Sequence, residues 1–208
     1  LDSEAEGSLW ISCAGGMSGI SHIPVARVDA KGKKVTVKIT GLMGGHSGAE
    51  IDKNRANANK LLGTFLYSLR KTTDYELISV QGGQKDNAIT REAEAELLIE
   101  AEELENVKAF AAEIQKAWRE EYTGTDEGIT VLLTDEGAQE ARVLHPTSRE
   151  KVLFYLMNVP FGIQKMSGTI SGLVETSSNI GILVTSEDEV TASSSIRSSV
   201  EAAGKNLS

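Results

Sequence analysis

The chain has 208 residues, of which 40% are hydrophobic and 25% are charged, a composition typical of a folded globular protein and not of a disordered one. Asp and Glu outnumber Lys and Arg by 30 to 21, giving a formal charge of -9, so no nucleic acid partner is expected because phosphate binding needs a basic surface. No stretch approaches the roughly 18 apolar residues of a membrane span, and the single Cys13 cannot form an internal disulfide, which together predict a cytoplasmic protein without a membrane partner.

The first forty residues contain three candidate strands. Residues 9–13 are apolar enough for a short strand, and the glycines within 15–19 then interrupt the pattern, which predicts a hinge. Residues 23–28 and 34–40 predict two further strands, joined by a turn at 29–32 because Asp-Ala-Lys-Gly is a turn composition.

A glycine-rich stretch at residues 44–51 follows, and it places His46 between two readable elements. The alternation of apolar and polar residues over 34–40 predicts a half-buried strand, and the apolar spacing over 54–71 predicts a helix. Such corners often carry functional groups, since a rigid scaffold aims the exposed side chain. The alternative is a turn that is glycine-rich for steric reasons, with His46 only solvated.

The middle of the chain predicts a strand at 75–80, a polar turn at 82–87, a strand at 92–101 and a helix at 104–122. The strand at 92–101 alternates Ala, Leu and Ile with Glu, and its acidic row is expected to be a solvated face and not a metal site. The apolar stripe of the helix at 104–122 is expected to be core, including Trp118.

The last third of the chain predicts a short strand at 129–133 and a helical face at 152–157, which Pro160 ends. Three further strands are expected in a hairpin-rich segment, at 172–175, 179–184 and 190–196.

The fold class expected from these elements is α+β, an antiparallel sheet with helices packed on one face. Similar successions of strand, helix, polar turn and strand pass through 87–89 and 179–181, which suggests two repeated α+β halves. Neither end of the chain has the pattern of a finished terminus, so we expect a piece of a longer polypeptide.

Three side chains beside turns or strand ends, His46, Asn87 and Arg197, are donors suited to a carbonyl or anionic oxygen. The alternatives are that Asn87 caps a turn and that Arg197 forms a surface ion pair. His22 and His145 are isolated. The sequence has no His-x-x-x-His or Cys-x-x-Cys spacing and no Gly-x-Ser-x-Gly elbow, so no self-contained metal site or serine nucleophile is predicted.

Several segments of the sequence resemble those of the aminoacyl-histidine dipeptidases, the bacterial carnosinase-like branch of the two-zinc peptidases. These segments are residues 1–7, 13–16, 41–51, 57–62, 87–92, 174–179 and 196–198. In that family such a segment is a lid or dimerisation domain inserted in a catalytic domain. The resemblance implies that residues 1–18 are a remnant of the catalytic domain and a hinge, and that 19–208 are the lid, with possible halves 19–125 and 126–208.

The resemblance also implies roles for single residues in a zinc-dependent dipeptidase that hydrolyses Xaa-His dipeptides. In the family a hydroxide bridging two zinc ions attacks the peptide carbonyl. Asp2 matches one zinc ligand, and the remaining ligands and the catalytic Glu lie outside this segment. His46 matches a lid histidine that polarises the carbonyl oxygen, commonly across a homodimer interface. Asn87 matches a pocket-lining residue, and Arg197 matches the arginine that holds the substrate carboxylate.

Two other readings stay open. One is a non-catalytic interaction or regulatory domain with the same fold. The other is the lid of a related enzyme acting on N-acyl amino acids or tripeptides. On the favoured reading the segment binds few or no zinc ions by itself and is inactive in isolation.

Overall fold

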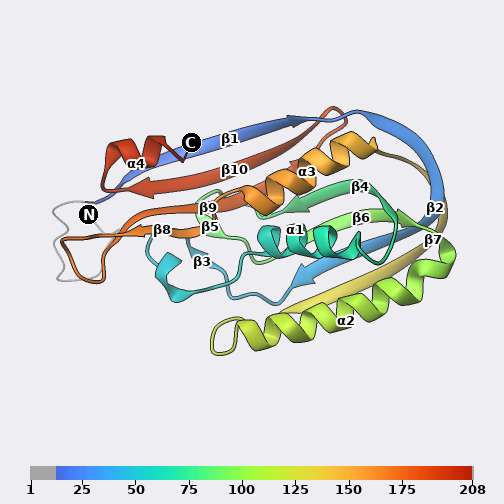
Figure 1. Cartoon of the computed structure of the whole chain (residues 1–208), viewed down its shortest axis with the longest axis horizontal. Coiled ribbons are helices and arrows are strands. Elements are labelled where there is room, and N and C mark those ends of the chain that lie inside the picture. Colours follow the sequence, from blue (N-terminus) through green and yellow to red (C-terminus); the bar gives the residue numbers. More distant parts are fainter. Residues whose placement is uncertain (1–12, 208) are drawn as a thin grey trace.

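The computed structural model describes residues 13–207, which form one large antiparallel sheet, a two-stranded ribbon and a set of helices (Figure 1). The strands are β1 (Gly15–Pro24), β2 (Arg27–Thr40), β3 (Gly45–His46), β4 (Tyr75–Gly82), β5 (Ala88–Ile89), β6 (Ala93–Ile99), β7 (Thr130–Leu144), β8 (Gly162–Met166), β9 (Val174–Thr185) and β10 (Glu189–Ser198). The α-helices are α1 (Ala58–Leu69), α2 (Leu104–Glu121), α3 (Pro146–Asn158) and α4 (Glu201–Lys205), with 3-10 turns at Ile51–Lys53 and Ala101–Glu103.

The large sheet has the order β1-β10-β9-β4-β6-β2-β7, and β8 pairs with the outer part of β9. All its strand pairs are antiparallel, as the sequence predicted. Helices α1, α2 and α3 lie on one face of this sheet (Figure 1), so the expected α+β architecture is confirmed. No helix within residues 13–207 is long and apolar enough to cross a membrane.

The core forms between these helices and the strands beneath them. Val35, Val37 and Ile39 of β2 are fully buried, which confirms the alternation in the sequence. Phe65 of α1 is also fully buried and meets Phe110 of α2 edge to face, with ring centroids 5.2 Å apart. Each such side chain stabilises the fold by about 1.5–3 kcal/mol through burial. Trp118 is 4% exposed, so its expected place in the core is confirmed.

The opposite face of the sheet carries the acidic row of β6, paired with lysines of β2. Nζ of Lys34 lies 2.6 Å from Glu96 and 3.1 Å from Glu136, and Nζ of Lys38 lies 2.8 Å from Glu92. These cross-strand pairs explain why Glu can alternate along a strand, since each carboxylate faces a cation on the neighbouring strand. The row is partly exposed, as expected for a solvated face.

Two expectations for the N-terminal region are wrong. The glycines within 15–19 are not a break, because they lie in β1, which pairs with β10 over its whole length. Residues 29–32 are not a turn either, because β2 runs unbroken from Arg27 to Thr40. A Cβ on Gly32 would lie 2.8 Å from the carbonyl oxygen of Ile99, so this glycine permits close packing of two strands. The predicted strand at 9–13 lies outside the described residues except for Cys13.

Two strands of the C-terminal half are longer than predicted. The short strand expected at 129–133 is the beginning of the 15-residue β7, and the strands expected at 172–175 and 179–184 are one strand, β9. The order strand, helix, hairpin occurs twice, as β2-α1-β4-β6 and β7-α3-β9-β10. The first strand of each set has a different place in the sheet. In the first set β2 lies beside β6, whereas in the second set β7 is separated from both β9 and β10. An internal duplication therefore stays a hypothesis.

The main-chain pairing between β4 and β9 is limited to one pair of residues, Gly82 and Leu183. Side chains replace the missing main-chain contacts there. The hydroxyl of Thr185 accepts from the N–H of Val80, at 2.9 Å, and donates to its carbonyl, at 2.7 Å.

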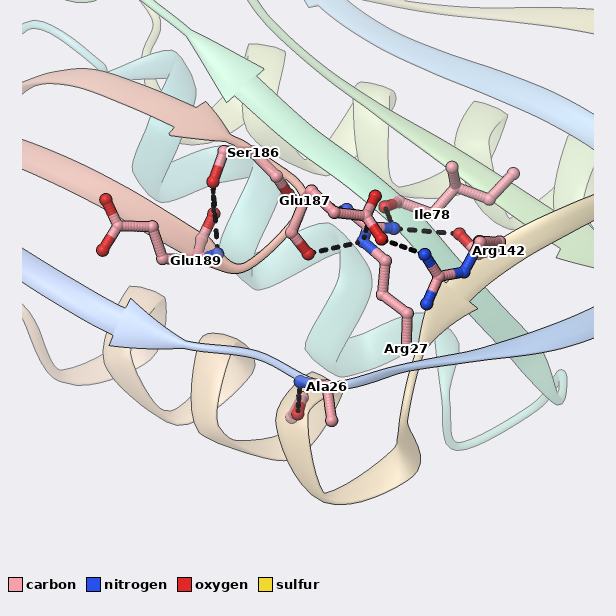
Figure 2. A network of polar contacts seen from close by, with 8 residues as sticks. Ala26, Arg27, Ile78, Arg142, Ser186, Glu187 and Glu189 are labelled. Atoms are coloured by element: carbon pink, nitrogen blue, oxygen red, sulfur yellow. Dashed lines mark hydrogen bonds and ion pairs between the residues drawn. The ribbon is translucent and has the colours of Figure 1, made fainter.

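Arg27 closes the same gap at the end of the sheet where β2 begins (Figure 2). Its guanidinium donates to the carbonyls of Ile78 in β4, Arg142 in β7, and Ser186 and Glu187 in the β9–β10 turn, at 2.9 to 3.1 Å. The Arg27 side chain is 8% exposed. One buried cation therefore joins three parts of the fold that are distant in sequence.

Candidate functional site

His46 lies in a short ribbon at the end of the molecule where β3, β5 and β8 are found (Figure 1). In this ribbon His46 pairs with Ala88, and the main-chain N–H of Ser47 donates to the carbonyl of Asn87, at 3.0 Å. The pairing brings two segments together that are about forty residues apart in sequence. The imidazole is exposed. The predicted corner between a strand and a helix is therefore present, with a 3-10 turn before α1.

The imidazole of His46 is held by the turn that follows it. Its Nδ1 accepts from the N–H groups of Gly48, at 3.2 Å, and Ala49, at 3.0 Å. A nitrogen that accepts from main-chain N–H groups carries no proton, so the hydrogen-bond network assigns the proton of the neutral ring to Nε2. The ring therefore presents an N–H donor away from the turn. Such a donor suits a carbonyl oxygen or an oxyanion.

Glu50 holds the main chain of His46 from the other side of the same turn. Its Oε2 accepts from the N–H of His46, at 2.8 Å, and its Oε1 lies 2.8 Å from Nη2 of Arg55. Arg55 also donates to the carbonyl of Gly44, which precedes the ribbon. The His46 N–H, and then the Arg55 guanidinium, lower the pKa of the Glu50 carboxyl below its ordinary value. Glu50 is therefore a carboxylate at neutral pH.

The segment that carries Asn87 is held in place by the buried side-chain amide of a residue in β9. The side chain of Asn179 in β9 donates to the carbonyls of Asp86, at 3.1 Å, and Ala88, at 2.9 Å. Its oxygen accepts from the side chain of Asn57, at 3.1 Å, which also caps α1 by accepting from two main-chain N–H groups. Asn179 and Asn57 are 0% and 1% exposed. These two amides fix the position of Asn87 relative to the start of α1.

Arg197 of β10 reaches the His46 turn from a strand of the large sheet. It pairs with Ser177 of β9 and Gly16 of β1. A Cβ on Gly48 would lie 2.8 to 3.0 Å from Nε, Cδ and Cζ of Arg197, so the guanidinium lies against the turn at this glycine. Nε of Arg197 is buried without a hydrogen-bond partner, and no carboxylate among the described residues forms an ion pair with Arg197. A guanidinium in this state is suited to an anionic ligand.

A buried carboxylate ties the loop before α1 to the end of α2. Asp126 is 0% exposed, and its two oxygens accept from the N–H of Met43 and the N–H of Ala56, each at 2.7 Å. The two N–H groups lie on either side of the His46 turn. Asp126 therefore holds both ends of the segment that carries His46.

The structure brings three of the four predicted site residues to one region. The β3–β5 ribbon pairs His46 with Ala88, the residue after Asn87, and Arg197 lies against the same turn at Gly48. The fourth, Asp2, lies outside the described residues. Of the isolated histidines, His22 is bound to Glu189 on the sheet edge, and His145 caps α3.

A separate cleft of about 620 Å³ lies beside the ends of β4 and β6, and Lys85, Thr90 and Arg91 are among its lining residues. Neither His46 nor Arg197 lines this cleft. Among residues 13–207, no group of three or more His, Cys, Asp or Glu side chains is placed to hold a metal ion.

Sequence reasoning missed the supporting residues of the site. Glu50 follows His46 by four residues and its carboxylate accepts from the His46 N–H, whereas a helix capping box requires a spacing of three residues, so the sequence carried no capping signal for Glu50. Asn57 directly precedes α1, so its capping role was readable from residue type. Asp126 had no such signal, because its two partners are 70 and 83 residues away.

Comparisons with known proteins bear on the family and the fold of this chain. Residues 37–126 match the family model described as a peptidase dimerisation domain, M20_dimer. The cytosol non-specific dipeptidase of Escherichia coli strain K12 is 34% identical over 202 residues, which cover 96% of this chain and 41% of the relative. The aminoacylhistidine dipeptidase of Vibrio alginolyticus, known from a crystal structure, is 31% identical, with a TM-score of 0.92. That match covers 99% of this chain and 42% of the solved chain.

The chain thus spans about two fifths of the length of the relatives that it matches. The family resemblance in the sequence is confirmed, and so is the dimerisation-domain fold. Residues 37–126 form a peptidase dimerisation domain of the M20 family, within a chain that has the fold of the corresponding part of a dipeptidase.

Proposed function

We propose that this chain is the lid and dimerisation domain of a longer zinc-dependent dipeptidase that hydrolyses Xaa-His dipeptides. In this proposal His46 donates from Nε2 to the scissile carbonyl oxygen, Arg197 binds the terminal carboxylate of the substrate, and Asn87 lines the same pocket. The supporting observation is the position of the Arg197 guanidinium against Gly48, two residues from His46. A carbonyl donor and a carboxylate anchor are what a dipeptide, with its C-terminal carboxylate one residue from the scissile bond, requires.

The residues from 13 to 207 do not supply a zinc site, since they contain no suitable group of ligands. Two zinc ions are therefore expected in the catalytic domain of the longer enzyme, together with the nucleophile and the general base, and Asp2 is proposed as one of the ligands. The donors described above need no metal for their own geometry. On this proposal the isolated chain is inactive, and a cytoplasmic location is expected, in keeping with the name of the E. coli relative.

A homodimer formed through this domain is part of the proposal, supported by the match to a peptidase dimerisation domain. Sedimentation of the isolated chain at several concentrations tests it. A sedimentation coefficient that rises with concentration is expected, whereas a monomer at all concentrations would count against self-association through this domain.

The proposed role of His46 is tested by His46→Ala in the longer enzyme. The value of kcat for a Xaa-His dipeptide is expected to fall by about 100- to 1000-fold, the usual loss for one oxyanion donor. Bound zinc, measured by atomic absorption, should not change. His22→Ala is the matched control, because His22 is also exposed and its imidazole contacts Glu189 at the edge of the sheet. Unchanged turnover in His46→Ala would remove the assigned role.

Substrate class is tested with the same enzyme on three compounds, a Xaa-His dipeptide, an N-acyl amino acid and a tripeptide. Preferred hydrolysis of the dipeptide is expected. A preference for either of the other two would keep the lid role and replace the substrate. No hydrolysis of any of them, with zinc bound, would favour a non-catalytic interaction domain.

A further inference from the structure

We propose that Glu50 is a positioning residue, which holds the His46 turn so that the imidazole keeps its proton on Nε2 and points that donor at the substrate. Glu50 touches neither substrate nor reacting atoms in this proposal, because it acts through His46. The inference rests on the proposed role of His46 and adds a residue that the family resemblance does not assign.

The main chain of His46 is held to Glu50 at two points. Oε2 of Glu50 accepts from the N–H of His46, at 2.8 Å, and the N–H of Glu50 donates to the carbonyl of His46, at 3.0 Å. These two bonds close the turn between them. The closed turn places the N–H groups of Gly48 and Ala49 on Nδ1 of the ring, at 3.2 and 3.0 Å. The tautomer of the ring is therefore a consequence of the turn geometry.

Arg55 in turn holds the carboxylate of Glu50. Its Nη2 lies 2.8 Å from Oε1 of Glu50, and its Nη1 donates to the carbonyl of Gly44. The Arg55 side chain is 16% exposed and that of Glu50 is 36% exposed, so the pair is only partly screened by solvent. Both oxygens of Glu50 are thus engaged, one by the His46 main chain and one by the guanidinium.

The geometry has a chemical consequence for the site. A free imidazole exchanges its proton between Nδ1 and Nε2, and it presents a donor toward the substrate in only one of these forms. A turn that supplies two donors to Nδ1 stabilises the Nε2–H form before the substrate arrives. Preorganised donors of this kind contribute to catalysis because no rearrangement is needed as charge develops.

The first test uses this chain labelled with 15N and records the two-bond 1H–15N spectrum of the imidazoles at neutral pH. The wild-type ring of His46 is expected to show the Nε2–H tautomer. Glu50→Ala should shift its two nitrogens toward the averaged values of a mixed population, and Glu50→Gln, which keeps an acceptor oxygen, should remain near wild type. An unchanged His46 spectrum in a folded Glu50→Ala variant would overturn the proposal.

The control for this test is Glu96→Ala. Glu96 is matched to Glu50, because its side chain is 32% exposed and forms one ion pair, with a lysine that is 17% exposed. Its removal should leave the His46 spectrum unchanged. If Glu50→Ala does not fold, Glu50→Asp tests the same contact, since the shorter side chain cannot reach both the His46 N–H and the Arg55 guanidinium. A wild-type His46 spectrum in Glu50→Asp would then overturn the proposal.

The second test is a double-mutant cycle in the longer enzyme. Glu50→Ala is expected to lower kcat by about 10- to 100-fold, the effect of a slightly misplaced catalytic group, with KM changed by less than about threefold. Because Glu50 acts through His46, adding Glu50→Ala to His46→Ala should cause no further loss beyond about threefold. Multiplicative losses would overturn the proposal.

The two tests separate the inference from the function on which it rests. If His46→Ala by itself leaves turnover intact, the proposed function of His46 fails. The spectrum of the isolated chain still decides whether Glu50 sets the tautomer of the ring.

Discussion

A Cβ atom on Gly48 would lie 2.8 Å from Nε of Arg197, so the missing side chain at Gly48 is what allows the guanidinium to lie against the His46 turn. Gly48→Ala should displace Arg197 and weaken binding of the substrate carboxylate. We expect KM for a dipeptide to rise roughly tenfold in the longer enzyme, because contacts to charged groups contribute about 1.5–3 kcal/mol. Steady-state kinetics checks this. Gly168→Ala is the control, since a Cβ there would meet no neighbouring atom, and an unchanged KM in a folded Gly48→Ala variant would contradict the assigned role of Arg197.

Removal of the Asp126 carboxylate should destabilise the fold. Asp126→Ala leaves the buried N–H of Ala56 and the partly buried N–H of Met43 without their acceptor, and a buried group left in this state costs about 1–3 kcal/mol. The free energy of unfolding, measured with urea, is expected to fall by about 2–4 kcal/mol, and by about half as much in Asp126→Asn, which keeps one acceptor. Asp52→Ala, which removes an exposed carboxylate, should change it by less than about 1 kcal/mol. Equal effects of the two alanine variants would show that the Asp126 contacts are not stabilising.

Arg27 should be equally important at the opposite end of the sheet (Figure 2). Arg27→Met removes four charge-assisted hydrogen bonds to main-chain carbonyls, and the free energy of unfolding is expected to fall by about 2–4 kcal/mol. The free energy of unfolding of Arg27→Lys should lie between those of the wild type and Arg27→Met, because one ammonium cannot reach all four carbonyls. Lys31→Met is the control, since the Lys31–Glu140 pair is largely exposed. A loss no larger than in the control would argue against the bridging role of Arg27.

Thermal stability should depend on pH through the pairs between β2, β6 and β7. Lys38 holds the pKa of Glu92 below its ordinary 4.5, and Thr36 and then Lys34 do the same for Glu136. A carboxyl with a lowered folded pKa contributes stability above its unfolded pKa, and this is lost as pH falls through the folded value. The Tm should therefore decline as pH falls below about 4.5.

The lysines of the same pairs give stability the opposite dependence on pH. Hydrogen bonding to Glu96 raises the pKa of Lys34, and that to Glu92 raises the pKa of Lys38, above the ordinary 10.5. Their contribution is present below 10.5 and is lost as pH rises through the folded value. Calorimetry across pH should show a Tm plateau between these limits. Lys38→Met should reduce the acid dependence, and an identical acid dependence in that variant would contradict the assignment.

The sequence was sufficient where neighbouring residues determine the structure. The alternation of Val35, Val37 and Ile39 predicted the buried face of β2, and the stripe that ends at Tyr122 predicted α2, because in both cases the period of the apolar residues is the period of the element. The prediction failed at Gly32, where a turn composition lies inside a continuous strand. A glycine is needed at this position because Ile99 of β6 approaches it closely, and this contact joins strands that are far apart in sequence.

The sequence by itself determined the three long helices, most of the long strands, the acidic solvated face and, through its family resemblance, the candidate site residues. Only the tertiary structure decided that His46, Asn87 and Arg197 share one region, because ribbon pairing and the β9–β10 register place them together over separations of 41 and 151 residues. It also decided that Glu50, Asp126 and Arg27 are the supporting contacts. The hydrogen bonds of Asp126 and Arg27 join atoms that meet only after the sheet has formed, so no local pattern of residues records them.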